Sequence, residues 1–288
     1  MAIESRRPSA GTPAESVASR VDAGTPPADA VPTGFPTVDR LLGGGLRRQD
    51  LVVLAGDVGS GKSALGLAIA LRAARLGTPT VVLSGEMGEE RLRERVLAIE
   101  GRVPVDDLRR GSLEPTARAA LDDLAGELAK LPLAFRPLLG WEFAEIEREV
   151  AAAPDAGLVV VDALQHVAPP RPAARADERV ALATRALKAV ALARRVAILA
   201  LAHLGRPVAT RPDPRPTLDD LGGRGAVKQQ ADVVLGLYRE EMYRPDQGIE
   251  GAAELLVAKN RSGPTGFVDL YFYRRWLRFE DLAEGGPD

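Results

Sequence analysis

The segment LVVLAGDVGSGKS at residues 51–63 contains the pattern that decides the fold. Its first six residues form an apolar run typical of a buried strand, and residues 56–63 fit the pattern G-x-x-x-x-G-K-[ST]. A segment with helical spacing of its apolar residues follows at 63–77. This order of strand, glycine-rich loop and helix predicts a phosphate site, because glycine lets backbone N–H groups turn toward an anion and the helix N-terminus adds its dipole.

The loop predicts a binding site for ATP and Mg²⁺. Lys62 can reach the β- and γ-phosphates, and the Ser63 hydroxyl can ligate Mg²⁺. A glycine-rich turn that matches by chance is the alternative, and the strand and helix on either side of the loop argue against it. The residues expected to contact the nucleotide are Gly56, Asp57, Val58, Gly59, Ser60, Gly61, Lys62 and Ser63.

The same alternation of strand and helix continues on both sides of this loop. It predicts an α/β domain with a mostly parallel central sheet that is covered on both faces. After Leu221, four strand-like runs with a tight turn at 261–266 predict an antiparallel C-terminal extension. The other predicted strands are 80–85, 131–135, 158–162 and 196–203, and the other predicted helices are 89–103, 114–131, 142–153 and 178–195.

The domain is expected to cover residues 32–281. Residues 1–31 are rich in Ala, Pro, Ser, Gly and Thr, and they contain too little apolar surface to offset the entropy of ordering. They predict a disordered tail. Residues 282–288 predict a short acidic tail.

Composition excludes several other classes of protein. The formal net charge of −2 leaves no global basic field, so nucleic-acid binding would depend on local arginines and lysines. The absence of cysteine excludes disulfides and thiolate zinc sites, and the count of two histidines argues against a histidine-rich metal centre. Aromatic residues make up 4%, too few for base stacking to be the main binding mode. Without a signal peptide or a long apolar run, we expect a cytoplasmic protein with no membrane partner.

Polar residues at the ends of predicted strands are candidates for catalysis. Asp162 ends the run LVVVD and would hold Mg²⁺, partly through water, although an Asp that caps a loop has the same pattern. Glu86 follows the strand at 80–85 and would act as a base or orient water, with a solvated loop carboxylate as the alternative. Gln165 would orient water or relay the state of the nucleotide, unless it is an ordinary surface residue.

Together these motifs resemble the RecA-like motor domain of replicative DnaB-type hexameric helicases. The resemblance extends over about 32–281 and implies a RecA-like P-loop NTPase fold and DNA-dependent ATP hydrolysis. Its motifs are GDVGSGKS at 56–63, SGEM at 84–87, VDALQ at 161–165, ALAHLGR at 200–206, QQAD at 229–232 and KNRSGPTG at 259–266.

The resemblance also implies roles for single residues. Glu86 corresponds to the catalytic glutamate and Asp162 to the Walker B aspartate. His203 lies where the family usually has a glutamine that senses the γ-phosphate. Arg261 corresponds to an arginine finger and Lys259 to its companion, both acting on the nucleotide of the neighbouring subunit. Their spacing puts both on one face of a strand, as it would also do for two solvated charges. A finger supplied in trans implies self-assembly into a homo-hexameric ring or a filament.

Two arginine-containing loops, after the strands at 158–162 and 196–203, are candidates for contact with single-stranded DNA. Arginine can bind backbone phosphates there without reading sequence, and such binding is weakened by salt. Solvated proline-rich loops are the alternative. The candidate residues are Arg171, Arg175, Arg206, Arg211 and Arg215, with Arg224 nearby.

Three functions remain open at this point. The first is a helicase or translocase motor that hydrolyses ATP between subunits and moves on single-stranded DNA. The second is a RadA- or KaiC-like ATPase switch that assembles without unwinding, because residues 33–46 resemble RadA as much as DnaB. The third, a scaffold without turnover, is disfavoured because the full catalytic set is present. Residues 1–31 do not resemble the helical N-terminal domain of the family, so a loader or collar protein is a candidate partner.

Overall fold

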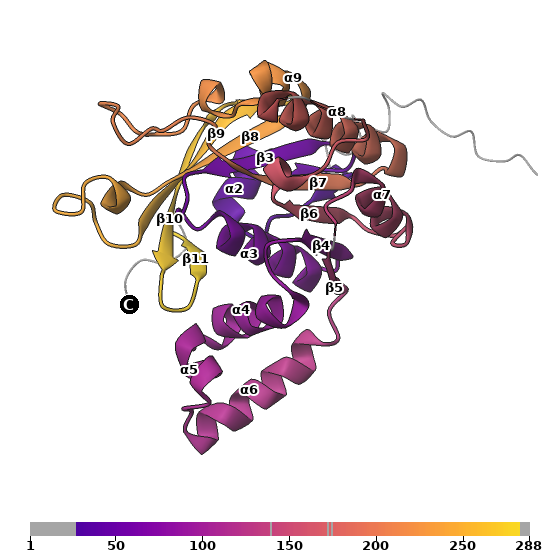
Figure 1. Ribbon diagram of the computed structural model, residues 1–288. Coiled ribbons are helices and arrows are strands. Elements are labelled where there is room, and N and C mark those ends of the chain that lie inside the picture. The colour runs from indigo at the N-terminus through magenta and orange to yellow at the C-terminus, as the bar shows by residue number, and fades with distance from the viewer. Residues whose placement is uncertain (1–26, 139, 172, 174, 283–288) are drawn as a thin grey trace, which may run out of the picture.

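A nine-stranded sheet runs through the part of the protein that the computed structural model describes, residues 27–282 without 139, 172 and 174 (Figure 1). Its strand order is β11-β10-β9-β8-β3-β7-β6-β4-β5. The parallel strands are β3 (Leu51–Gly56), β4 (Thr80–Ser84), β5 (Leu133–Pro137), β6 (Leu158–Asp162), β7 (Ala197–His203) and β8 (Val233–Tyr238). Antiparallel strands β9 (Ala252–Asn260), β10 (Gly266–Tyr273) and β11 (Arg278–Asp281) extend one side.

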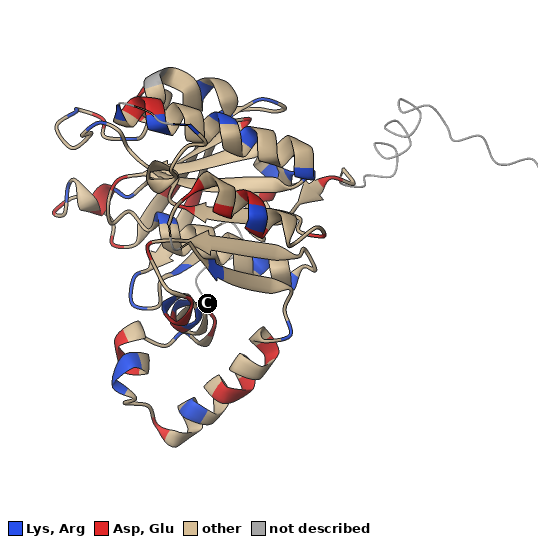
Figure 2. Ribbon diagram, turned by 45° about the vertical axis from the view of Figure 1, so that its right-hand side comes forward, with Lys and Arg blue, Asp and Glu red and all other residues tan. Residues whose placement is uncertain are grey.

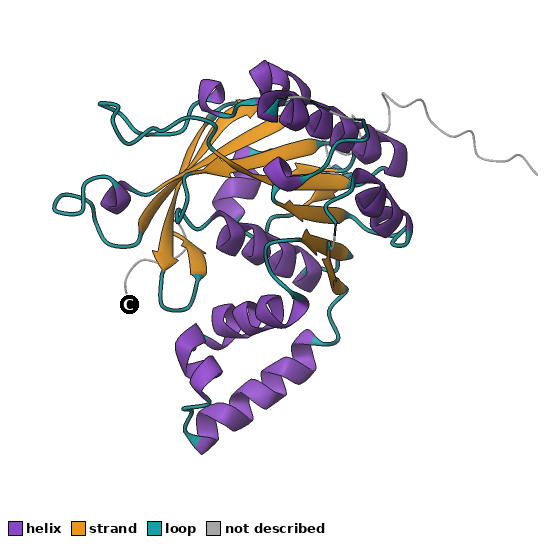
Figure 3. Ribbon diagram, viewed as in Figure 1, coloured by secondary structure: helices purple, strands orange, loops and turns teal. Residues whose placement is uncertain are grey.

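Helices cover both faces of this sheet (Figure 3). Alternate residues of β3 explain why: Val52 and Leu54 belong to one apolar cluster, whereas Val53 and Ala55 belong to the other. The first cluster includes residues of α2 (Pro36–Leu41), α3 (Lys62–Arg75) and α4 (Glu89–Gly101). The second includes residues of α7 (Phe143–Ala151), α8 (Ala176–Arg194) and α9 (Ala226–Gln230).

Two further helices, α5 (Val105–Arg110) and α6 (Pro115–Leu128), project from the sheet below α4 (Figure 1). No residue of α5 is buried, and Leu121 is the buried residue of α6. The arm formed by α5 and α6 therefore contributes little to the core that positions the site.

None of the helices in the described residues combines the length and apolarity that crossing a membrane requires.

The predicted α/β fold with a mostly parallel sheet and an antiparallel extension is confirmed, with one correction. The sequence predicts that the strand after Leu221 belongs to the antiparallel extension, but this strand, β8, pairs in parallel with β3, with Val233 opposite Val52. The antiparallel extension therefore begins at β9. Helix α5 was not predicted as an element of its own.

The start of the domain also differs from the prediction. Strand β1 (Ala30–Val31) pairs with β2 (Leu46–Arg47), so the last two residues of the predicted disordered segment form a strand. Residues 27–29 form a turn before that strand, whereas residues 1–26 of the predicted tail and residues 283–288 of the predicted acidic tail lie outside the described residues. Leu282 lies in a turn at the end of β11.

The buried carboxylate of Asp232, just before β8, contacts β3 and α8, and its removal should destabilise the fold. It accepts a hydrogen bond from the N–H of Leu51 at 2.9 Å and forms ion pairs with Lys188 and Arg261. The change Asp232→Ala leaves the buried N–H of Leu51 without its acceptor and the ammonium of Lys188 without its counter-charge, although Lys188 still donates to the carbonyl oxygen of Gln49. We expect it to lower the free energy of unfolding by about 3–5 kcal/mol in urea denaturation.

The matched control is Asp219→Ala, which removes the ion pair between two exposed side chains, Asp219 and Lys228. Such pairs contribute less than about 1 kcal/mol. Equal losses in the two variants would show that the buried contacts of Asp232 do not stabilise the fold.

Candidate active site

The loop between β3 and α3 has the backbone that a phosphate-binding loop requires. Gly59 and Gly61 have φ of 81° and 100°, which side chains with a Cβ rarely adopt. A Cβ at Gly61 would also lie 3.0 Å from the ring of Phe279. These two glycines let the chain curl just before α3 begins at Lys62.

Lys62 and Asp162 are both buried, and neither forms an ion pair within 4.0 Å among the described residues. Burial lowers the pKa of Lys62, against the effect of nearby Asp162, and its ammonium donates to the carbonyl oxygen of Asp57 at 2.7 Å. Burial raises the pKa of Asp162, against a hydrogen bond with the Ser63 hydroxyl. The buried hydroxyl of Ser60 has no partner among the described residues. A phosphate chain with a divalent cation would supply charge of both signs here, so the residues present fit ATP and Mg²⁺.

A cavity of about 510 Å³ opens beside the loop, large enough for a nucleotide-sized ligand. Three arginines line it in addition to Lys62, which suits a polyanion. Arg239 is the most buried, with a side chain 5% exposed; it forms an ion pair with Glu241 and donates to the carbonyl oxygen of Gly59 at 3.3 Å. The lining residues are Val58, Gly59, Gly61, Lys62, Ser63, Ala64, Glu86, Arg95, His203, Arg239, Met242, Phe272, Arg274 and Leu277.

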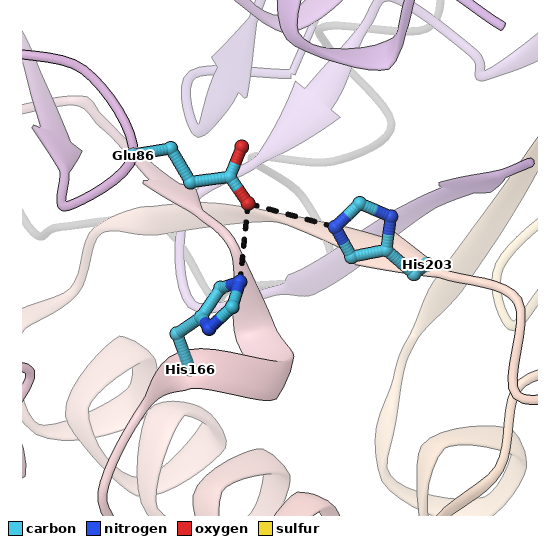
Figure 4. Close-up of side chains that lie close together, drawn as sticks. All are labelled: Glu86, His166 and His203. Atoms are coloured by element: carbon cyan, nitrogen blue, oxygen red, sulfur yellow. Dashed lines mark ion pairs between the residues drawn. The ribbon is translucent and has the colours of Figure 1, made fainter. Parts of the chain in front are cut away.

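The structure brings Glu86 together with both histidines of the chain (Figure 4). Oε1 of Glu86 lies 3.2 Å from Nε2 of His166 and 3.5 Å from Nε2 of His203. Glu86 follows β4, His166 lies just beyond β6, and His203 ends β7, so all three residues come from the carboxyl edge of adjacent parallel strands. Glu86 and His203 were predicted to lie at this edge, whereas His166 was not singled out.

Gln165 joins two of these strands rather than facing solvent. Its amide donates to the carbonyl oxygen of His203 at 2.8 Å and accepts from the N–H of His203 at 3.1 Å. The short helix η1 (Leu164–His166) is thereby tied to the end of β7. The predicted roles of Gln165, orienting water or relaying the state of the nucleotide, stay predictions.

Lys259 and Arg261 lie at the opposite edge of the sheet. Because β9 runs antiparallel to β8, its last residues lie beside the start of β8, about 20 Å from the carboxyl edge. The Lys259 ammonium donates to the carbonyl oxygen of Ala231 at 2.6 Å, and Arg261 forms an ion pair with Asp232 at 3.1 Å. Both reach the carbonyl oxygen of Gln229, so they share one face as predicted. Neither can reach the nucleotide of its own chain.

The candidate DNA-contacting arginines fall into two groups. Arg211 forms two hydrogen bonds of 2.9 Å with Asp220, and Arg215 donates to Glu254 at 2.7 Å, so both guanidinium groups have internal partners. Contact of these two arginines with DNA stays a prediction. Arg171, Arg175 and Arg206 are exposed, and the side chain of Arg224 lies outside the described atoms. Figure 2 shows Lys and Arg interspersed with Asp and Glu over the ribbon, so any contact with DNA would rest on a few local residues.

Arg239 and Trp141 lie near the nucleotide cavity, and neither is among the site residues that the sequence predicts. Arg239 directly follows β8 at the carboxyl edge, as Glu86 follows β4, but the sequence predicts that this strand belongs to the antiparallel extension. Trp141 packs on Gly85, where a Cβ would lie 2.1 Å from the indole ring, and its ring lies 4.9 Å from that of His166. No local pattern in the sequence indicates that contact.

A phosphate-binding loop after β3, in a mostly parallel sheet with carboxylates at the ends of β4 and β6, defines a RecA-like P-loop nucleoside triphosphatase domain. The chain belongs to the family described as DnaB-like helicase C terminal domain, whose profile matches residues 30–281. This assignment agrees with the family that the motifs of the sequence suggest.

Comparison with single proteins gives the same family. The chain is 32% identical over 257 residues to the replicative DNA helicase DnaB of Geobacillus stearothermophilus, covering 88% of this chain and 56% of the relative. It therefore spans about half the length of that relative. A solved DnaB-like replicative helicase, described with its interactions with primase, matches with a TM-score of 0.87 and 26% identity over 94% of this chain and 68% of that one. A solved ATPase domain matches with the same TM-score and identity over 93% of this chain and 97% of its own.

Proposed function

We propose that the protein is the ATPase motor of a DnaB-type DNA helicase, which hydrolyses ATP between subunits and moves on single-stranded DNA. One observation carries this proposal: Glu86 and the phosphate-binding loop lie at one edge of the sheet, whereas Arg261 and Lys259 lie at the other. Because the two halves cannot meet within one chain, a complete site forms between the carboxyl edge of one subunit and the amino edge of the next. Such a head-to-tail interface closes into a ring or winds into a filament.

The described residues divide the chemistry of hydrolysis among them. The loop amides and Lys62 bind the phosphates, and the Lys62 ammonium leaves the Asp57 carbonyl to do so. Mg²⁺ bound by Ser63 and Asp162 would neutralise charge on the phosphate oxygens. Glu86 accepts a proton from water as the water oxygen bonds to the γ-phosphorus and the bond to the β,γ-bridging oxygen breaks. Arg261 and Lys259 of the neighbouring subunit stabilise the charge that develops.

DNA contact is proposed for the loops after β6 and β7, which carry Arg171, Arg175 and Arg206. Both loops leave the same edge of the sheet as the nucleotide cavity, so a change at the phosphates can reach them through the strand ends that Gln165 joins. A collar or loader protein and a cytoplasmic location stay predictions.

The test of the motor is ATP turnover with and without single-stranded DNA at low and moderate salt. We expect strong stimulation by DNA that weakens as salt rises, because phosphate contacts release counterions. Turnover that is indifferent to DNA would instead support the RadA- or KaiC-like switch, which the family assignment disfavours.

Arg206→Ala should weaken binding to single-stranded DNA irrespective of its sequence. Loss of one phosphate contact makes the negative slope of log K against log salt shallower by about 0.7. Fluorescence anisotropy of a labelled oligonucleotide measures this slope. The control is Arg118→Ala, an exposed arginine on the projecting helix α6. An unchanged slope in the Arg206 variant would remove this loop from the interface.

A further inference from the structure

Both histidines of the chain converge on Glu86, and we propose that these three side chains form a binding site for a divalent transition-metal ion of the Zn²⁺ class (Figure 4). Occupation of this site would hold the Glu86 carboxylate as a ligand and stop ATP turnover. The binding stands on geometry alone, whereas the inhibition rests on the proposed role of Glu86. The low histidine count argued against a histidine-rich centre, but a mixed centre needs no more than two imidazoles when a carboxylate completes it.

The spacing of the ligand atoms suits such an ion. Zn²⁺ binds imidazole nitrogen and carboxylate oxygen at about 2.1 Å, which places neighbouring ligands of a tetrahedron about 3.4 Å apart. The two distances from Oε1 of Glu86 to the histidine nitrogens are 3.2 and 3.5 Å. All three ligand atoms lie within 4.8 Å of one another, so a small rotation of the exposed side chains closes the third edge. Solvent water can fill the fourth position.

Packing around the cluster holds the imidazoles in place. The ring of His166 lies against that of Trp141, with centroids 4.9 Å apart, and Trp141 in turn packs on Gly85. The backbone of His203 is held on both sides by the amide of Gln165.

An ion can enter this site from solvent, because the side chains of His166 and Glu86 are 48% and 33% exposed. Two imidazoles with one carboxylate favour Zn²⁺, Cu²⁺ or Ni²⁺, whereas Mg²⁺ prefers oxygen ligands. The site is therefore chemically distinct from the pair Ser63 and Asp162 proposed for Mg²⁺. A carboxylate that is bound to a metal cannot accept a proton from water, while Lys62 and the loop amides stay free to bind ATP.

Titration of the full chain with Co²⁺ tests the site without any need for turnover. Bound Co²⁺ has a visible ligand-field absorption, and displacement by Zn²⁺ then gives the affinity for Zn²⁺. We expect one Co²⁺ per chain, and we expect His166→Asn and His203→Gln each to weaken binding by more than about 10-fold. The control Glu147→Gln, an exposed carboxylate on α7, should bind as the unmodified chain does. Absence of stoichiometric binding, or equal binding by all variants with intact thermal melting, would overturn the proposal.

ATP hydrolysis in excess Mg²⁺ tests the consequence. Micromolar Zn²⁺ should stop turnover of the unmodified chain without displacing a fluorescent ATP analogue. The His166→Asn variant should keep its own metal-free rate at the same Zn²⁺ concentration. Inhibition that persists in this variant would place the inhibitory ion elsewhere. Binding of Co²⁺ without inhibition by Zn²⁺ would leave the metal site standing and would contradict the proposed role of Glu86.

Discussion

Replacing Glu86 by glutamine is expected to lower the rate of ATP hydrolysis by about 10²–10⁴-fold and to leave ATP binding nearly unchanged. Glutamine keeps the size of the side chain and its place beside the two histidines, but it cannot take a proton from water. The phosphate-binding loop and Asp162 lie on other strands and are not altered. Loss of turnover with retained binding is therefore the signature of a missing base rather than of a damaged pocket.

Two measurements on one preparation check this result. Steady-state phosphate release gives kcat, and a fluorescent ATP analogue gives the affinity. The control is Glu90→Gln, an exposed carboxylate in the first turn of α4, which should hydrolyse ATP at the unmodified rate. A Glu86 variant with the unmodified rate would refute its assignment as the base.

Replacing Arg261 by alanine should lower turnover further, by about 10³–10⁵-fold, the range typical of a residue that stabilises the transition state of phosphoryl transfer from a neighbouring subunit. The fold should tolerate the change, because the side chain is 57% exposed and Asp232 keeps its contacts with Leu51 and Lys188. The Arg118→Ala variant again serves as the control for loss of an arginine.

Mixing two inactive variants distinguishes a residue that acts in trans from one that acts in cis. A subunit with Arg261→Ala still offers Glu86, and a subunit with Glu86→Gln still offers Arg261. In an equal mixture, one half times one half, or about a quarter, of the interfaces combine both intact residues. Recovery of activity up to that fraction supports a site shared between subunits. No recovery, under conditions where the subunits exchange, would contradict it.

The parts of the fold that depend on local sequence could be predicted. The strands at 51–56 and 158–162 have the predicted bounds, because an apolar run that ends in Gly or Asp marks where a buried strand gives way to a loop. The parallel pairing of β8 with β3 could not be predicted, since strand neighbours are chosen by the packing of the whole sheet. The short strand β1 could not be predicted for a similar reason, because it depends on its pairing with β2.

The candidate site shows the same division. Glu86 and Asp162 could be placed because the carboxyl ends of parallel strands meet at one edge. His166 belongs to no periodic pattern, and its contact with Glu86 depends on how η1 turns after β6. The internal partners of Arg211 and Arg215, Asp220 and Glu254, are also matters of tertiary packing that a loop sequence does not reveal.

Because the phosphate-binding loop and Arg261 lie at opposite edges of the sheet, each subunit has two different contact surfaces, and subunits join head to tail. A linear assembly of such subunits always has one terminal site that lacks Arg261 of a neighbour, whereas a closed ring has no incomplete site. The rate of ATP hydrolysis per subunit should therefore rise as linear assemblies lengthen, and it should reach its full value when the ring closes. Hydrolysis rate measured against protein concentration would then report how the subunits are joined.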